Sequence, residues 1–173
     1  MSNIKISAAD IADFAIVQEI AKATFYETFS SSNSRQTMQD YLLASFNDEK
    51  VKAELSTIDS LFFIAFDEEA AIGYLKVNIG DSQTELQESD SLEIERIYVK
   101  AEYQGKSIGQ LLYNKAIEIA QQQNKSSVWL GVWEENPKAI RFYEKNGFVP
   151  FSKHVFNMGN EAQTDIMMRK TIG

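Results

Sequence analysis

The stretch "LEIERIYVKAEYQGKSIGQLL" (residues 92–112) decides the fold, because in it a strand leads through a short loop into a helix. Residues 91–100 are typical of a strand, and residues 108–123 repeat apolar side chains at helical spacing. Gly105 and Gly109 stand between the two, where glycine lets a backbone turn tightly and approach a ligand. The partly positive start of a helix attracts anions, so the stretch predicts a phosphate site. An ordinary strand–helix turn is the alternative, since neither common phosphate-loop pattern fits.

The sequence before this stretch predicts two helical regions and a strand hairpin. Ser7 and Asp10 resemble a capping box at the start of the first helix. A second helical region is expected over residues 35–56. The continuous apolar run at 61–66 is typical of a strand buried on both faces, and residues 71–79 form its expected hairpin partner.

The sequence after this stretch completes an alternating pattern. Residues 127–133 predict a strand, and Asn136 is a good N-cap for the short helix that follows, with a proline at its first position. Gly147 suits the left-handed residue after that helix. Two runs within 148–170 predict a closing hairpin. The order of elements favours a mixed α/β layer fold.

Composition bounds the function. The 173 residues are enough for one domain, expected to span 1–173. The absence of cysteine excludes disulfides, thiolate metal sites and a cysteine nucleophile. The one histidine, His154, is too few for an ordinary zinc site and is expected to be structural or at the surface, so no metal is predicted. The formal charge of −8 disfavours nucleic acid and favours a cationic small substrate, with ordinary solubility as the alternative explanation of the charge.

No segment of the sequence is typical of a transmembrane helix or a signal peptide. No apolar run approaches the roughly 20 residues of a transmembrane helix. The first ten residues lack the basic and apolar segments of a signal peptide, so we expect a cytoplasmic protein. Monomer and homodimer are both left open.

Two motifs resemble those of the GCN5-related N-acetyltransferases, the GNAT superfamily. Gln104 and Gly109 match the ends of the family's Q/R-x-x-G-x-G/A loop, although Ser107 replaces its first glycine. The segment "VWLGVWEENPKAIRFYEKNGF" (128–148) matches the family's second signature. The segment "FNMGNEAQTDIMM" (156–168) is most similar to the PaiA-type spermidine/spermine N-acetyltransferases.

The resemblance implies a fold and a co-substrate. The fold would be a single GNAT domain, α/β, with a mostly antiparallel mixed sheet, helices on both faces, and a V-shaped split between the strands at 92–99 and 127–133. Acetyl-coenzyme A would lie in that split. The residues expected to hold it are Ile97, Tyr98, Val99, Gln104, Gly105, Lys106, Ser107, Ile108, Gly109, Gln110, Asn136, Lys138, Tyr143 and Lys145.

Acetyl transfer to an amine needs two proton transfers. The amine, with a pKa of about 10.4, must lose a proton before it attacks. Glu93 and Glu95, expected on one strand face with Ile97 and Val99, could bind the amine and accept this proton, with Glu95 preferred. The alternative is an exposed face of ordinary acids. The resemblance makes Tyr143 the proton donor to the leaving sulfur, the alternative being a packed aromatic side chain.

The acceptor is the least readable part of the sequence. Tyr26, Glu27 and Phe29 could line a polyamine site, or could be core residues. The predicted activity is direct acetyl transfer to a primary amine in a ternary complex, with spermidine or spermine as acceptor. Acetylation of a protein N-terminus or lysine is the first alternative. A regulator that senses acetyl-CoA without turnover is the second.

Overall fold

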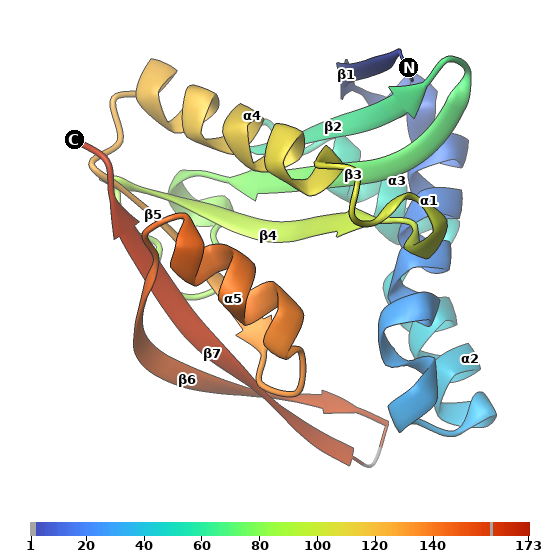
Figure 1. Cartoon of the computed structure of the whole chain (residues 1–173). Coiled ribbons are helices and arrows are strands. Elements are labelled where there is room, and N and C mark those ends of the chain that lie inside the picture. Colours follow the sequence, from blue (N-terminus) through green and yellow to red (C-terminus); the bar gives the residue numbers. More distant parts are fainter. Residues whose placement is uncertain (1–2, 160) are drawn as a thin grey trace.

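A computed structural model describes residues 3–159 and 161–173 (Figure 1). Within them, seven strands form one sheet in the order β1-β2-β3-β4-β5-β7-β6. The strands are β1 (Ile4–Ala9), β2 (Ser60–Asp67), β3 (Ala70–Asn78), β4 (Ser91–Val99), β5 (Ser127–Trp133), β6 (Val149–Met158) and β7 (Glu161–Thr171). The helices are α1 (Phe14–Phe29), α2 (Arg35–Ser45), α3 (Asp48–Leu55), α4 (Ile108–Gln122) and α5 (Pro137–Lys145).

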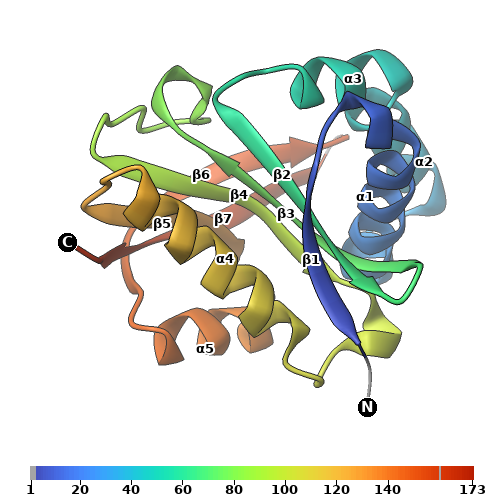
Figure 2. The ribbon, with the colours of Figure 1, turned by 90° about the horizontal axis from the view of Figure 1, so that it is seen from above.

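Helices cover both faces of the sheet (Figures 1 and 2). One face packs against α1, α2 and α3, where Ile20, Phe25 and Phe62 belong to one buried cluster. The other packs against α4 and α5, where Leu75, Leu112 and other residues form a second cluster. The predicted α/β layer fold is therefore confirmed. No helix among the described residues is both long and apolar enough to cross a membrane.

Local capping explains where the helix predictions were right and where they were wrong. The capping box at the first helical turn pairs Asp10 with Asp13, not with Ser7. The expected helix over 35–56 is two helices, because the Asn47 side chain accepts a hydrogen bond from the Lys50 amide and starts α3. The predicted Asn136 cap is present.

The sheet divides at the β4–β5 junction, as predicted. These two strands are the parallel pair, and their pairing runs only from Ser91 opposite Ser127 to Ile94 opposite Leu130. Beyond Leu130, β5 stays paired with β7 up to Trp133, while β4 stays paired with β3. The two halves of the sheet therefore diverge from one point, which we call the apex of the split.

A β-bulge in β4 overturns the predicted common face of Glu93, Glu95, Ile97 and Val99. Lys76 of β3 pairs with Arg96 and the next residue, Val77, pairs with Ile94, so Glu95 is the extra residue. The bulge reverses the alternation. Ile97 and Val99 contact the cluster under α4, whereas both carboxylates lie on the opposite face, toward α1, α2 and α3.

Candidate active site

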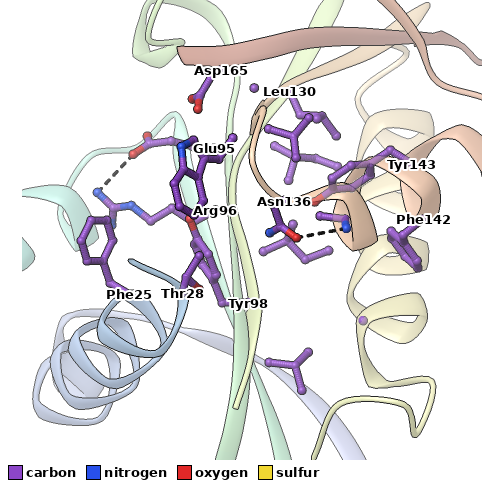
Figure 3. Close-up of a pocket in the computed structure, with 18 of the residues that line it drawn as sticks. Phe25, Thr28, Glu95, Arg96, Tyr98, Leu130, Asn136, Phe142, Tyr143 and Asp165 are labelled. Carbon is purple, nitrogen blue, oxygen red and sulfur yellow. Dashed lines mark hydrogen bonds and ion pairs between the residues drawn. The ribbon is translucent and has the colours of Figure 1, made fainter. Parts of the chain in front are cut away.

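A cleft of about 910 Å³ follows the split in the sheet (Figure 3). One wall comes from α1 and β4, with Phe25, Thr28 and Tyr98. The facing wall comes from β5 and α5, with Leu130 and Tyr143 among its residues. Residues separated by more than a hundred positions in sequence thus face one space. The cleft continues to the loop before α4, which lines it with Tyr103, Gln104, Gly105, Ser107, Ile108, Gly109 and Gln110.

This loop is shaped for an anion. Gly105 and Ser107 have left-handed backbones, with φ of +80° and +66°. Alternation of such residues with ordinary ones turns successive N–H groups toward one side, which makes a concave anion site. A Cβ built at Gly105 or Gly109 would have no atom within 4 Å, so the space beside the loop is open. The first N–H groups of α4 lack partners within the helix. The loop therefore fits a diphosphate.

Side-chain contacts hold the loop against β4 and α5. The Gln104 amide donates a hydrogen bond of 3.1 Å to the Val99 carbonyl and accepts one of 3.4 Å from Lys138. The Asn136 side chain accepts a bond of 3.3 Å from the Ala139 amide, which fixes the start of α5. Of these five residues, all except Ala139 were predicted to contact the co-substrate, and all five line the cleft.

Two predicted co-substrate residues do not reach the lining. Lys106 points back over the Tyr103 ring, with its Nζ 5.2 Å from the ring centroid. Lys145 lies exposed in the last turn of α5. Neither lysine is among the residues that line the cleft, although Ile97, Tyr98 and the remaining predicted residues are.

Tyr143 faces the cleft from α5. Its ring is buried against Phe142 and Phe148, with centroids 5.3 and 5.8 Å away. Burial raises the pKa of the Tyr143 phenol well above its ordinary value, so the hydroxyl is protonated at any working pH. Within the described residues no hydrogen bond engages this hydroxyl, although Tyr143 lines the cleft. The side chain is thus both packed and available as a donor.

Glu95 lies in an ion-pair network. Its carboxylate accepts hydrogen bonds from Lys76 at 2.7 Å and Asn78 at 2.8 Å, and pairs with Arg96 at 3.1 Å. Glu54 of α3 accepts hydrogen bonds from both terminal nitrogens of Arg96. Burial alone would raise the pKa of Glu95, but the charges of Arg96 and Lys76 bring it below the ordinary value. A low pKa makes Glu95 a weak base.

Glu93 is held differently. Its carboxylate accepts hydrogen bonds from the Asn78 amide at 3.0 Å and the Thr84 backbone at 2.8 Å, with no cation among these partners. Burial therefore dominates and raises the pKa of Glu93, although the bonds from Asn78 and Thr84 act the other way. The directions of the two pKa shifts favour Glu93 over Glu95 as a proton acceptor, whereas the sequence led us to prefer Glu95.

Only one of the three predicted acceptor residues lines the cleft. Phe29 does, with its ring tilted against Trp133 and the centroids 4.7 Å apart. Tyr26 points to a separate surface hollow, and Glu27 accepts a hydrogen bond from the Ala101 amide. The helical period explains the difference, because residues three and four apart share a face of α1 while adjacent ones do not. Phe25 and Thr28 take the place expected for Tyr26.

A carboxylate that the sequence did not single out also lines the cleft. Asp165 of β7 faces His154 of β6, and His154 forms an ion pair with Glu85 of the β3–β4 loop. His154, expected to be structural or at the surface, therefore borders the cleft. Strand periodicity gives no signal for Asp165; it lies within the segment 156–168 that carried the family resemblance. In the part of the chain that the structure describes, no three acidic or histidine side chains are grouped for a metal ion.

Comparisons with known proteins agree with this geometry. Residues 15–148 match the model of the acetyltransferase (GNAT) family. An uncharacterized N-acetyltransferase of Lactobacillus delbrueckii subsp. lactis is 38% identical, over 98% of this chain and 96% of that protein. A spermidine N(1)-acetyltransferase of Thermoplasma acidophilum is 28% identical, over 84% and 88%. The crystal structure of a PaiA N-acetyltransferase from T. acidophilum in complex with coenzyme A superposes with a TM-score of 0.78 at 26% identity, covering 98% and 99% of the two chains.

Proposed function

The chain belongs to the acetyltransferase (GNAT) family, and from this premise we propose that it moves the acetyl group of acetyl-CoA to a primary amine of a polyamine such as spermidine. One observation carries the proposal: a single cleft has a diphosphate-shaped loop at one end and carboxylates at the other. The first suits the co-substrate and the second suits a cationic acceptor.

Acetyl-CoA fits the cleft in a defined direction. Its diphosphate would meet the amides of residues 105–110, and its pantetheine arm would run along Ile97 and Val99 toward the apex. The main chain of β4 has no strand partner on that side beyond Ile94, so its groups are available to the arm. Bound there, the co-substrate supplies an activated acetyl thioester. Asn136 and Lys138 would border it from α5.

The side chains then serve acetyl transfer. The Tyr143 hydroxyl protonates the sulfur as the carbon–sulfur bond breaks, since a phenol is a suitable acid for a thiolate. The carboxylates of Glu93 and Glu95 make this part of the cleft negative and attract an ammonium group. Glu93, with the raised pKa, is the better proton acceptor of that pair.

A polyamine matches the lining beyond the apex. Aromatic rings of Phe25, Phe29 and Tyr41 provide an apolar wall for methylene segments. Glu85 adds a carboxylate for an ammonium group at a second position. The similarity to a spermidine N(1)-acetyltransferase of T. acidophilum supports the same acceptor class.

An amine panel tests this function. We would follow free thiol release from acetyl-CoA with spermidine, spermine, a monoamine of similar length, and a peptide with a free N-terminus. We expect the polyamines to have the highest kcat/KM, and we expect added salt to raise their KM by screening the carboxylates. The monoamine is the matched control, because it has the same reach but lacks the distal charge.

Three outcomes would contradict the proposal in different ways. A peptide preferred by roughly tenfold or more, which is about 1.4 kcal/mol of transition-state binding, would replace the polyamine with a protein acceptor. A preference for the monoamine would show that carboxylates in the cleft do not bind a distal ammonium group of the acceptor. Binding of acetyl-CoA without thiol release for any amine would favour a sensor over an enzyme.

A further inference from the structure

The carboxylate of Asp165 lies beside the apex of the split, although the residue pairs further along β5. It pairs with Trp133 across β5 and β7, and its carboxylate leans over Gly131. A Cβ at Gly131 would lie 3.1 Å from the Asp165 Oδ2. Gly131 directly follows Leu130, the last β5 residue that pairs with β4. Figure 3 shows Asp165 at the end of the cleft where Glu95 and Leu130 lie. This is the point where an acceptor entering the cleft would meet the acetyl group.

Its oxygens differ from those of the β4 carboxylates in their contacts. Glu95 is bound by Lys76, Asn78 and Arg96, and Glu93 by Asn78 and Thr84. Within residues 3–159 and 161–173, no hydrogen bond or ion pair engages the Asp165 carboxylate. The Asp165 oxygens keep their full capacity to accept N–H bonds from a ligand in the cleft.

The groups around Asp165 set its charge. His154 faces it from β6, Glu85 approaches from the β3–β4 loop, and Tyr98 of β4 is close enough to interact with its charge. The facing β5 residue in the pairing is Trp133, which does not titrate. Burial raises the pKa of Asp165 to about 6, with His154 lowering it and Glu85 raising it. The carboxylate is thus ionised at neutral pH and still basic enough to take a proton.

We propose that Asp165 is a catalytic residue that binds the ammonium group of the acceptor at the apex and takes its first proton. This inference rests on the proposed amine acetylation. The neutral nitrogen then attacks the thioester carbon; the carbon–nitrogen bond forms, and the sulfur leaves with the electrons of the carbon–sulfur bond. Tyr143 protonates the sulfur, and the second nitrogen proton replaces the Tyr143 proton through solvent. The ammonium and acetyl-CoA give the amide, CoA and one proton, which Asp165 releases.

The test is the pH dependence of kcat/KM for spermidine between about pH 5 and about pH 9. The variants are Asp165→Asn, Glu93→Gln and, as a matched control, Glu161→Gln, which removes an exposed carboxylate of β7 outside the cleft lining. An enzyme that binds the ammonium form should rise in kcat/KM through about pH 6 and then level off. In Asp165→Asn only free amine can react, so kcat/KM should climb roughly tenfold per pH unit across the range.

At neutral pH we expect Asp165→Asn to lose at least about 100-fold in kcat/KM, the usual scale of a lost general base. Acetyl-CoA binding and the melting temperature should not fall, which separates a catalytic role from a structural one. Glu161→Gln should match the wild type, and Glu93→Gln should keep the plateau.

Wild-type turnover together with an unchanged plateau in Asp165→Asn would overturn the inference and leave the function standing. A plateau lost in Glu93→Gln instead would also overturn it, by moving the proton to Glu93. A rise in KM alone would reduce Asp165 to a binding group and overturn its role as base. Absence of wild-type turnover with every amine would overturn the proposed function and this inference together.

Discussion

At the scale of single residues, we expect Tyr143 to combine packing and chemistry in one ring. Tyr143→Phe keeps the ring against Phe142 and Phe148 and removes only the hydroxyl. We expect kcat to fall by roughly 10- to 1000-fold, because the sulfur must then leave without its proton donor. Acetyl-CoA affinity and melting temperature should change little. Wild-type kcat at saturating substrates would leave Tyr143 as a packing residue.

Ser107 carries a strain that the family loop avoids. Its φ of +66° is a left-handed conformation, which is unfavourable for residues that have a Cβ. Ser107→Gly should remove this strain and stabilise the fold. Part of that gain is lost because glycine is more flexible in the unfolded chain. We expect a net gain of about 0.5–1 kcal/mol, measured by denaturant unfolding. Ser107→Ala is the control and should give no gain; a gain in both variants would mean that the hydroxyl, not the backbone, is unfavourable.

At the scale of elements, the loop before α4 should carry co-substrate binding. Saturating acetyl-CoA at about 100 times its Kd stabilises the protein by about 2.7 kcal/mol, a rise of roughly 5–10 °C in melting temperature. Gly109→Glu should abolish this rise by placing a negative charge at the diphosphate. Gly109→Ala is the matched control, since its Cβ would meet no atom within 4 Å. A folded Gly109→Glu variant with the full rise would remove the loop from the binding site.

Sequence patterns predicted where the helices and strands lie better than they predicted which face of an element a side chain is on. The strand–loop–helix stretch, the Asn136 cap and the split follow from local periodicity, capping chemistry and family motifs. The bulge at Glu95 does not, because it depends on how β3 and β4 align and on the Lys76–Glu95 contact. One extra residue then reversed the expected face of both glutamates.

Other parts of the site depend on contacts between distant segments. Tyr26 and Phe25 are neighbours in sequence, and only the docking of α1 on the sheet determines which of them faces the cleft. Asp165 reaches the apex because β7 inserts between β5 and β6, an arrangement that no local pattern in the sequence encodes.

At the scale of the whole molecule, the stability of the fold depends on pH through Glu95 and Asp165, and the two carboxylates act in opposite directions. The lowered pKa of Glu95 gives stability that is present above its ordinary value of 4.5 and lost as pH falls through its folded-state pKa. The raised pKa of Asp165 gives stability that is present below 3.8 and lost as pH rises through about 6. We therefore expect the free energy of unfolding to peak in mild acid.

Variants separate the two contributions. Asp165→Asn should be more stable than wild type at pH 7 by about 1 kcal/mol, a value reduced for partial exposure. Glu95→Gln should be less stable at pH 7 by about 3 kcal/mol, because it leaves part of the charge of Lys76 and Arg96 uncompensated, and its loss of stability in acid should be shallower. Urea unfolding from about pH 3 to about pH 8 measures both. Parallel curves for all three proteins would contradict the assigned pKa shifts.

The short parallel junction between β4 and β5 has a consequence for how the backbone exchanges hydrogen with solvent. Four residue pairs close one end of the split, and past Ile94 and Leu130 each strand keeps a neighbour on one side only. The inner edge of β4 is thus a row of peptide groups that faces the cleft and lacks a strand partner. Deuterium should enter these amides sooner than those shared with β3, and a chain laid along the edge would slow that entry. In this sense the sheet is built one strand short, and we expect the bound ligand to complete the ladder.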